Sequence, residues 1–349
     1  MSIKNSNYQK HGSIPYKELR AFGIDQEKIL DFSATVNPLP MPQSIRSLFS
    51  ADGIKSYPDP DSYDAINALS NYYNLAPEMF VITAGVTETI FILPQIANSA
   101  IQFVPTYGDY QMAFERYKKS IISLQFPASE KQLVSFVKYF RKKNADLLIV
   151  CNPNNPDGLY LTVDEIEYLC RELKDSIICV DESYQEMGKG SKSAVSIINS
   201  YENLILLKSL TKPFGIGGLR IGYTVSSAKN SGKIRSLVIP WGVSGLAQKV
   251  IPAVLDHIEE YKSQWNQIHK QKESLIGQIE RIGIPVEHGV CPFFLIKMEK
   301  SVNIRLELLR RYSIAVRDCS SFSLEGKIRL MPSVDKNNRL LLEVLREFC

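Results

Sequence analysis

Hydrophobic positions in the middle of the chain form short, nearly continuous runs separated by longer segments. Four of these runs lie at residues 101–104 (IQFV), 146–151 (DLLIVC), 176–181 (SIICVD) and 203–208 (NLILLK). Strands that are apolar on both faces and alternate with helices are typical of a largely parallel sheet covered by helices on both sides. The pattern therefore predicts an α/β domain in this part of the chain.

The segments between these runs have helical spacing. In residues 163–173 the apolar side chains at three- and four-residue intervals are Ile166, Leu169, Cys170 and Leu173. This spacing places them on one face of a helix. Thr162 precedes the segment and Glu165 follows three residues later, which is the arrangement of a capping box. We expect this helix to be scaffold.

After residue 241 the pattern changes. A long polar and amphipathic stretch runs to about residue 282, followed by strand-like runs at 293–298, 313–318 and 327–332. We expect a long connecting helix and then a small α+β lobe. The expected division is residues 1–40 for an N-terminal arm with part of the small domain, 41–240 for the large domain, and 241–349 for the connecting helix and small C-terminal domain.

Composition and charge restrict the class of protein. The 349 residues are 44% hydrophobic and 22% charged, which is typical of a folded chain of about two domains. The 41 basic and 37 acidic residues are spread along the chain, so no nucleic-acid partner is expected. We find neither an apolar signal core nor a stretch of about 18 apolar residues, and we expect a cytoplasmic protein without a membrane partner. The six cysteines form no CxxC pair, so we expect free thiols and no metal.

The strongest chemical signal is SLTKPFGIGGLRIGY at residues 209–223, directly after an apolar run. It offers the hydroxyls of Ser209 and Thr211, then Lys212, a glycine-rich turn and Arg220. Hydroxyls, backbone N–H groups and a guanidinium suit a phosphate, and a lysine beside them can form an imine with an aldehyde. Taken alone, such a lysine is more often a surface residue.

Other polar residues follow the ends of predicted strands. Asp181 ends the run 176–181, Tyr184 lies three residues later, and Asn155 follows the run 146–151. Ligands of open α/β sheets bind at the carboxyl ends of the strands. A carboxylate there can pair with a protonated pyridine nitrogen, although an aspartate at this place equally caps helices and an asparagine equally shapes a turn.

Two upstream segments complete the set. In TAGVTET, residues 83–89, the N–H groups of Gly85, Val86 and Thr87 can meet a phosphate at a helix N-terminus. In PTYGDY, residues 105–110, Tyr107 can place its ring against a heteroaromatic ligand, with core packing as the alternative.

A family resemblance follows from the order of these motifs. TAGVTE, PTYGDY, NPNNPDG, DESY and SLTK, with an arginine eight residues after the lysine, resemble fold-type-I pyridoxal-phosphate enzymes of the aminotransferase class I and II superfamily. The resemblance runs from about His11 to the C-terminus. It implies an α/β fold with a mostly parallel central sheet flanked by helices, a smaller α+β domain, and pyridoxal 5′-phosphate bound by residues 41–240.

The resemblance also implies a role for each residue. Lys212 would form the Schiff base, Asp181 would pair with the pyridine nitrogen and Tyr107 would stack on the ring; these three are the catalytic candidates. Asn155 and Tyr184 would bind the ring hydroxyl. The residues of the implied phosphate cup are Gly85, Val86, Thr87, Ser209, Thr211 and Arg220. Tyr57, in KSYPDPD, resembles the tyrosine that reaches the phosphate in the neighbouring subunit, which implies a homodimer.

Within the superfamily, residues 11–24, 29–42, 238–248 and 314–322 resemble threonine-phosphate decarboxylases of cobamide biosynthesis, which are sisters of histidinol-phosphate aminotransferases. The implied partner is a small phosphorylated amino acid, L-threonine O-3-phosphate or L-serine O-phosphate. Its decarboxylation would give aminopropanol phosphate or ethanolamine phosphate for the linker of the cobamide nucleotide loop. The alternative is an aminotransferase of the histidinol-phosphate type, because the cofactor residues do not select the bond that breaks.

A phosphorylated amino acid needs several cationic or donor groups. The resemblance implies that the substrate contacts are His11, Thr35, Asn37, Asn155, Arg317 and Arg329. Taken singly, the histidine is more often solvated and the arginines more often pair on the surface.

The sequence also departs from the family pattern. Asp157 replaces the usual threonine of NPTG, Ser13 replaces a glycine, and Ser333 stands near where these decarboxylases commonly carry another arginine. With one cation fewer, serine phosphate becomes an alternative to threonine phosphate.

Overall fold

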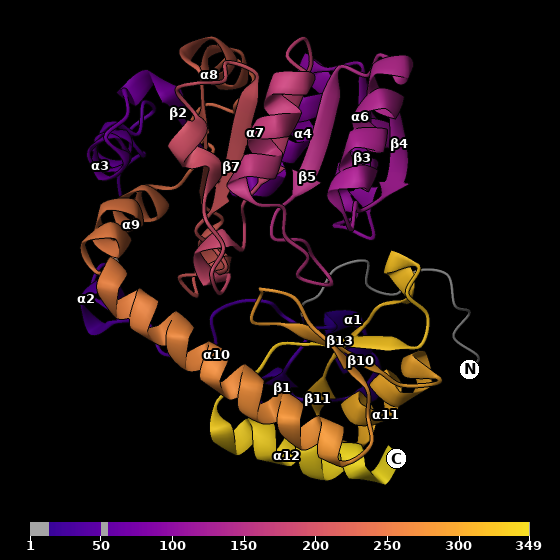
Figure 1. Ribbon diagram of the computed structural model, residues 1–349. Coiled ribbons are helices and arrows are strands. Elements are labelled where there is room, and N and C mark those ends of the chain that lie inside the picture. Colours follow the sequence, from indigo (N-terminus) through magenta and orange to yellow (C-terminus); the bar gives the residue numbers. More distant parts are fainter. Residues whose placement is uncertain (1–13, 50–54, 349) are drawn as a thin grey trace.

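The computed structural model describes residues 14–49 and 55–348, which form a large lobe and a small lobe joined by a long helix (Figure 1). His11, Ser13 and Cys349 lie outside the described residues. The large lobe is built on a seven-stranded sheet with the strand order β2-β8-β7-β6-β5-β3-β4. Its strands are β2 (Phe80–Thr83), β3 (Ser99–Val104), β4 (Ser120–Gln125), β5 (Leu147–Cys151), β6 (Ile177–Asp181), β7 (Leu204–Ser209) and β8 (Gly222–Ser226).

The sheet is mostly parallel. Strands β7, β6, β5, β3 and β4 pair in parallel, whereas β8 is antiparallel to both of its neighbours, β2 and β7. The four apolar runs of the sequence form β3, β5, β6 and β7, and β5 and β7 are buried along their whole length. The prediction of a parallel sheet is therefore confirmed.

Helices cover both faces of this sheet. One face packs against α4 (Val86–Ile96), α5 (Asp109–Arg116) and α8 (Ala228–Arg235). The other packs against α3 (Tyr63–Tyr73), α6 (Glu130–Lys143), α7 (Val163–Glu172) and α9 (Gly245–Asp256). Helix α7 has the predicted capping box: the N–H of Glu165 donates to Thr162 Oγ1 over 3.3 Å and the N–H of Thr162 donates to Glu165 Oε2 over 2.7 Å.

The expected single connecting helix is divided in two. Helix α9 ends at Asp256, and α10 (Ile258–Arg281) begins after His257, whose backbone leaves the helical region. The amphipathic pattern continues across this break, so hydrophobic spacing did not reveal it. Figure 1 shows α10 running from the large lobe down along the small lobe.

The small lobe contains a four-stranded sheet, β12-β13-β10-β9. Its strands are β9 (Val286–Glu287), β10 (Phe294–Lys297), β12 (Arg317–Asp318) and β13 (Lys327–Leu330). Helices α10, α11 (Ser301–Tyr312) and α12 (Asp335–Leu345) pack on it through a core that includes Leu275, Phe294 and Leu341.

The N-terminal segment joins the small lobe. Strand β1 (Leu30–Asp31) pairs in parallel with β11 (Ile314–Ala315). Helix α1 (Tyr16–Phe22) packs nearby, and the short helix α2 (Gln43–Arg46) follows the crossing to the large lobe. Residues 32–37 thus pass between the lobes.

The structure also describes the helices and thiols on which the composition bears. None of the helices in residues 14–49 and 55–348 is long and apolar enough to cross a membrane. The five cysteines that the structure describes are buried and free. In the same part of the chain no group of three or more His, Cys, Asp or Glu residues is placed to hold a metal ion.

Candidate functional site

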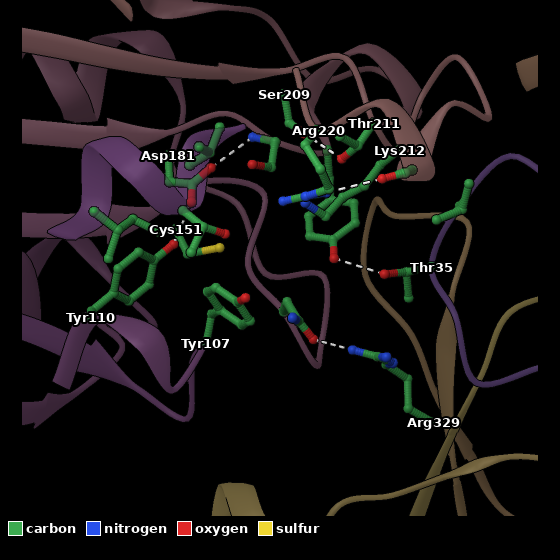
Figure 2. Close-up of a pocket in the computed structure, with 18 of the residues that line it drawn as sticks. Thr35, Tyr107, Tyr110, Cys151, Asp181, Ser209, Thr211, Lys212, Arg220 and Arg329 are labelled. Atoms are coloured by element: carbon green, nitrogen blue, oxygen red, sulfur yellow. Dashed lines mark hydrogen bonds between the residues drawn. The ribbon is translucent and has the colours of Figure 1, made fainter. Parts of the chain in front are cut away.

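A cavity opens at the carboxyl ends of the parallel strands, between the two lobes. The predicted residues that line it are Thr35, Val86, Thr87, Tyr107, Asn155, Asp181, Tyr184, Ser209, Thr211, Lys212, Arg220 and Arg329. Figure 2 shows these side chains converging, with Asp181 and Tyr107 on one side and Thr35 and Arg329 on the other. Motifs that are more than 100 residues apart in the sequence therefore share one site.

One end of the cavity is built for an anion. Gly85 precedes the first turn of α4 with φ +82°, and Arg220 has a left-handed backbone with φ 53°. A Cβ at position 85 would lie 2.8 Å from Arg220 Nη2, so only glycine lets the guanidinium approach the helix N-terminus. Ser209 Oγ and Thr211 Oγ1 lie 2.8 Å apart beside them. A helix N-terminus, an arginine and two hydroxyls together suit a phosphate.

Lys212 faces the cavity just beyond β7. Its Nζ lies 5.3 Å from the centre of the Tyr184 ring, and its carbonyl accepts from the N–H of Asn37 over 2.8 Å. Burial lowers the pKa of Lys212, while the carboxylate of Asp181 opposes that shift. A lysine with a lowered pKa has more neutral amine at ordinary pH, which is the form that attacks an aldehyde.

Asp181 ends β6 and is 3% exposed. Its Oδ1 accepts from the N–H of Ser183 over 2.9 Å and its Oδ2 accepts from the hydroxyl of Tyr110 over 2.6 Å. Tyr110 lies in PTYGDY, but its role is not visible in the sequence, because a tyrosine in the first turn of an amphipathic helix is indistinguishable from a core residue.

Tyr184 and Asn155 face the cavity from neighbouring turns. The Tyr184 and Thr35 hydroxyls lie 2.7 Å apart, and burial raises the pKa of Tyr184, so its phenol stays protonated. Asn155 Oδ1 accepts a hydrogen bond from Arg329 Nη1. Across the cavity, burial raises the pKa of Tyr107, which also remains a neutral ring.

Two arginines of the small lobe form the other end of the site. Arg317 and Arg329 are paired across β12 and β13 and are 6% and 2% exposed. Arg329 Nη2 donates to the carbonyl of Ser33 over 2.9 Å. Arg317 does not line the cavity itself; its Nη2 donates to Ser321 Oγ over 2.7 Å, and its guanidinium lies 5.2 Å from the ring centre of Phe322, which does.

The remaining predicted residues lie elsewhere. Asn37 does not line the cavity: its side-chain amide donates to the Pro213 carbonyl over 3.1 Å and to Gln264 Oε1 over 2.8 Å, which supports the turn after Lys212. Tyr57 is 90% exposed and lies outside the cavity of its own chain. His11 is outside the described residues.

A buried ionic cluster behind the site was also missed. Lys208 is 1% exposed, and its Nζ lies 2.9 Å from Glu182 Oε2 and 2.8 Å from Glu186 Oε1. Burial opposes the charge of Lys208, but the two carboxylates raise its pKa well above the ordinary value. The cluster ties β7 to the turn that carries Tyr184. In the sequence, Lys208 ends an apolar run and has no visible partner.

The turn that carries Asn155 is docked on the small lobe. The N–H of Val290 donates to the Gly158 carbonyl over 3.0 Å. Lys272, on α10 and 4% exposed, donates to the carbonyls of Gly289 over 2.8 Å and Cys291 over 2.6 Å, and burial lowers its pKa to about 8. Asp157, the departure from NPTG, accepts from Asn154 Nδ2 over 2.8 Å within the same turn.

These groups fit a phosphorylated pyridine aldehyde. The anion cup, the amine of Lys212 and the buried carboxylate of Asp181 can face the phosphate, the aldehyde and the ring nitrogen. The hydroxyl of Tyr184 and the amide of Asn155 are placed to bind a ring oxygen. No residue of the cavity contradicts such a ligand.

Comparison with known proteins gives the same family. A family model described as aminotransferase class I and II matches residues 27–345. The adenosylcobalamin biosynthesis bifunctional protein CobDQ of Leptospira interrogans is 28% identical over 353 residues, which cover 97% of this chain and 41% of that protein. The chain thus spans less than half of this relative, whereas alignments with several histidinol-phosphate aminotransferases cover nearly all of both proteins.

Solved structures share the fold. L-threonine-O-3-phosphate decarboxylase from Porphyromonas gingivalis has a TM-score of 0.81 at 24% identity, covering 90% of this chain and 98% of that chain. Histidinol-phosphate aminotransferase from Sinorhizobium meliloti, solved in complex with pyridoxal 5′-phosphate, has a TM-score of 0.86 at 18% identity, covering 96% of this chain and 94% of that chain.

Proposed function

The chain belongs to the aminotransferase class I and II family, its cofactor is pyridoxal 5′-phosphate, and from this premise we propose that it decarboxylates an O-phosphorylated amino acid. The substrate is L-threonine O-3-phosphate or L-serine O-phosphate, and the product is the corresponding amino-alcohol phosphate. Similarity to a protein of adenosylcobalamin biosynthesis supports a role in making the linker of the cobamide nucleotide loop.

The observation that carries this proposal is the pair of buried arginines at the substrate end. Arg317 and Arg329 are register partners on β12 and β13 and are both buried, and burial together with the charge of Arg329 lowers the pKa of Arg317 to about 10. A ligand with both a carboxylate and a phosphate relieves this repulsion by pairing with both cations. An amino acid without the phosphate supplies only one of these anions.

The residues of the chain prepare the substrate for bond cleavage. When bound, the cofactor supplies an electron sink next to the α-carbon of the substrate. The carboxylate of Asp181 is placed where it would favour a protonated ring nitrogen. Lys212, with its lowered pKa, is suited to accept a proton from the substrate amine and to donate it to the α-carbon once carbon dioxide has left. Phe322 and Val36, which line the cavity, place apolar surface beside the reacting atoms.

The substrate end selects the bond that breaks, because only the substituent held perpendicular to the ring overlaps its π system. In our proposal Arg317, which lies behind the cavity-lining ring of Phe322, anchors the phosphate when the substrate is bound. Arg329 and Asn155, which line the cavity, contact the carboxylate. Since Asn155 also faces the ring hydroxyl, it connects the cofactor end with the substrate end.

We also propose that the enzyme is a homodimer in which Tyr57 reaches the phosphate cup of the neighbouring subunit. Tyr57 is 90% exposed and lies beside Trp241, with ring centres 6.4 Å apart. Trp241 and Ile239 are 58% and 68% exposed. Three large exposed hydrophobic side chains on neighbouring segments are typical of a surface that is covered in an assembly.

The second candidate is an aminotransferase acting on histidinol phosphate or a related amine. Its support is the similarity to histidinol-phosphate aminotransferases along nearly the whole chain. The cofactor end of the site serves both reactions equally.

The test is a direct assay of the holoenzyme. We expect carbon dioxide and an amino-alcohol phosphate from threonine phosphate or serine phosphate. With unphosphorylated threonine, kcat/KM should be lower by about 100-fold, because the ligand loses charge-assisted hydrogen bonds. Rapid formation of glutamate from 2-oxoglutarate and histidinol phosphate, without carbon dioxide from either phosphoamino acid, would replace the decarboxylase with the aminotransferase.

A further inference from the structure

Resting on the proposed roles of Asp181 and Tyr107, we propose that Tyr110 is a positioning residue that holds these two groups in place against the cofactor ring. Tyr110 lies in the first turn of α5 and is 1% exposed. It contacts both groups with different parts of one side chain, its hydroxyl and its ring. The structure therefore predicts two separable effects at one position.

The first contact fixes the carboxylate. The Tyr110 hydroxyl donates to Asp181 Oδ2 over 2.6 Å, and the N–H of Ser183 donates to Oδ1 over 2.9 Å. Hydrogen bonds to an ionised carboxylate are short and roughly twice as strong as neutral ones. With one donor on each oxygen, the carboxylate cannot rotate freely, and its negative charge is partly satisfied before any ligand binds.

The second contact fixes the aromatic ring that is expected to stack on the cofactor. The ring centres of Tyr107 and Tyr110 lie 5.8 Å apart at an interplanar angle of 84°. Edge-to-face pairs of this geometry are favoured by the aromatic quadrupole. Tyr110 thus restricts the tilt of the Tyr107 ring, while Figure 2 shows both tyrosines on the same side of the cavity as Asp181.

The groups around Asp181 keep the hydroxyl of Tyr110 protonated, so that it can donate a hydrogen bond. Burial and the Asp181 charge raise the pKa of Tyr110 well above its ordinary value. Burial, with the Asp181 charge, raises the pKa of the Cys151 thiol to about 12, and Lys212, just beyond the end of β7, interacts electrostatically with the same carboxylate. Around neutral pH Tyr110 and Cys151 are therefore neutral, and the phenol can donate throughout.

The physical consequence concerns the proton shared by the carboxylate and the ring nitrogen. A hydrogen bond from Tyr110 stabilises the negative charge of the carboxylate, which is the form that pairs with a protonated ring nitrogen. The proton therefore stays on the ring nitrogen. Without the hydroxyl, the carboxylate attracts the proton more strongly, and the ring becomes a weaker electron sink.

The experiment uses the holoenzyme and the variant Tyr110→Phe, which keeps the ring and removes the hydroxyl. We expect kcat to fall about 10-fold with little change in KM, since a hydrogen bond to a charged group is lost. The pH midpoint at which the visible absorbance of the Lys212-bound cofactor titrates should rise by about one unit. Tyr110→Leu removes the edge contact as well, and the cofactor should dissociate about 3- to 10-fold more readily than from Tyr110→Phe.

A matched control is Tyr201→Phe. Tyr201 also donates to a carboxylate, Glu167 Oε1, over 2.8 Å, but on helix α7 away from the cavity. This variant should leave kcat and the absorbance midpoint unchanged. A midpoint in Tyr110→Phe equal to that of the wild type would overturn the proposal.

A near-isosteric replacement tests the hydroxyl without disturbing the fold, and two spectroscopic and binding readouts do not depend on turnover. Incorporation of 3-fluorotyrosine at position 110 retains the hydroxyl and strengthens it as a donor, so the absorbance midpoint should move down; an unmoved midpoint counts against the proposal. If the wild type neither decarboxylates nor transaminates, the proposed function fails. The absorbance midpoint and the cofactor dissociation constant would still test the role of Tyr110, because neither requires turnover.

Discussion

Lys208 and Lys212 are both buried near the end of β7, but their pKa values are shifted in opposite directions. Lys208 lies on one side of the sheet between two carboxylates, which raise its pKa well above the ordinary value against the effect of burial. Lys212 faces the cavity, where burial lowers its pKa and Asp181 only partly compensates. The first is fixed as a cation, and the second is available as an amine.

Burial alone therefore does not make a lysine reactive. Both side chains lose water, but the number and distance of the carboxylates determine which protonation state the fold favours. The carboxylates in contact with Lys208 come from the segment 182–186, directly after Asp181. One stretch of sequence, residues 181–186, thus supplies both the carboxylates that pair with Lys208 and the carboxylate that acts on Lys212.

The largest expected effect is on the reaction, in Lys212→Ala. Decarboxylation should fall by at least about 10²- to 10⁴-fold, because the proton-transferring amine is lost. The visible absorbance of the lysine-bound cofactor should disappear, while far-ultraviolet circular dichroism stays unchanged. Retention of the visible band in this variant would show that another lysine binds the cofactor.

A smaller effect, on stability, is expected in Lys208→Met. The substitution leaves the buried Glu182 and the partly buried Glu186 without their cation, which should cost about 3–5 kcal/mol in the free energy of unfolding. Urea unfolding followed by circular dichroism measures this. Lys262→Met is the matched control, because Lys262 pairs with Glu259 over 2.6 Å at the surface; its change should stay within about 0.5 kcal/mol. Equal losses in the two variants would contradict the role given to the cluster.

The smallest effect is expected at a third lysine, Lys272, which has carbonyl acceptors but no carboxylate within ion-pair distance in the described part of the chain. Burial lowers its folded-state pKa from 10.5 to about 8. Because the unfolded chain then binds more protons, the destabilising effect of the charge is complete below the folded pKa and disappears as pH rises toward the unfolded value.

The free energy of unfolding of the wild type, relative to Lys272→Met, should therefore increase with pH. We expect about 1–2 kcal/mol between about pH 8 and about pH 9.5. Lys270→Met, on the exposed side of the same helix, controls for the change in net charge. A difference that is constant over this pH range would show that Lys272 does not titrate as its surroundings imply.

Much of the fold could be predicted because its signals are local. The apolar runs of β3, β5, β6 and β7 and the capping box of α7 each lie within a few residues, and the structure has them where hydrophobic spacing indicates. The division between α9 and α10 could not be predicted, because it depends on the backbone of His257 rather than on a change in pattern.

The site could be predicted only in part. Residues that carry the chemistry, such as Lys212 and Asp181, stand in motifs whose order is informative. Tyr110 and Lys208 act through partners 71 and 26 residues away, Asp181 and Glu182, and no local pattern reveals such pairs. Asn37 was expected at the substrate, but its amide is occupied by Pro213 and Gln264, contacts that only the three-dimensional structure supplies.

Because Gly85 lies so close to Arg220, these two positions limit each other in any redesign of the anion site. Any side chain at position 85 would occupy the space of the guanidinium, and the left-handed φ of +82° adds strain. Single replacements at 85 should therefore weaken cofactor retention even when they are small and uncharged. A library that aims at a different anion must randomise 85 and 220 jointly, because these two positions behave as one unit of variation.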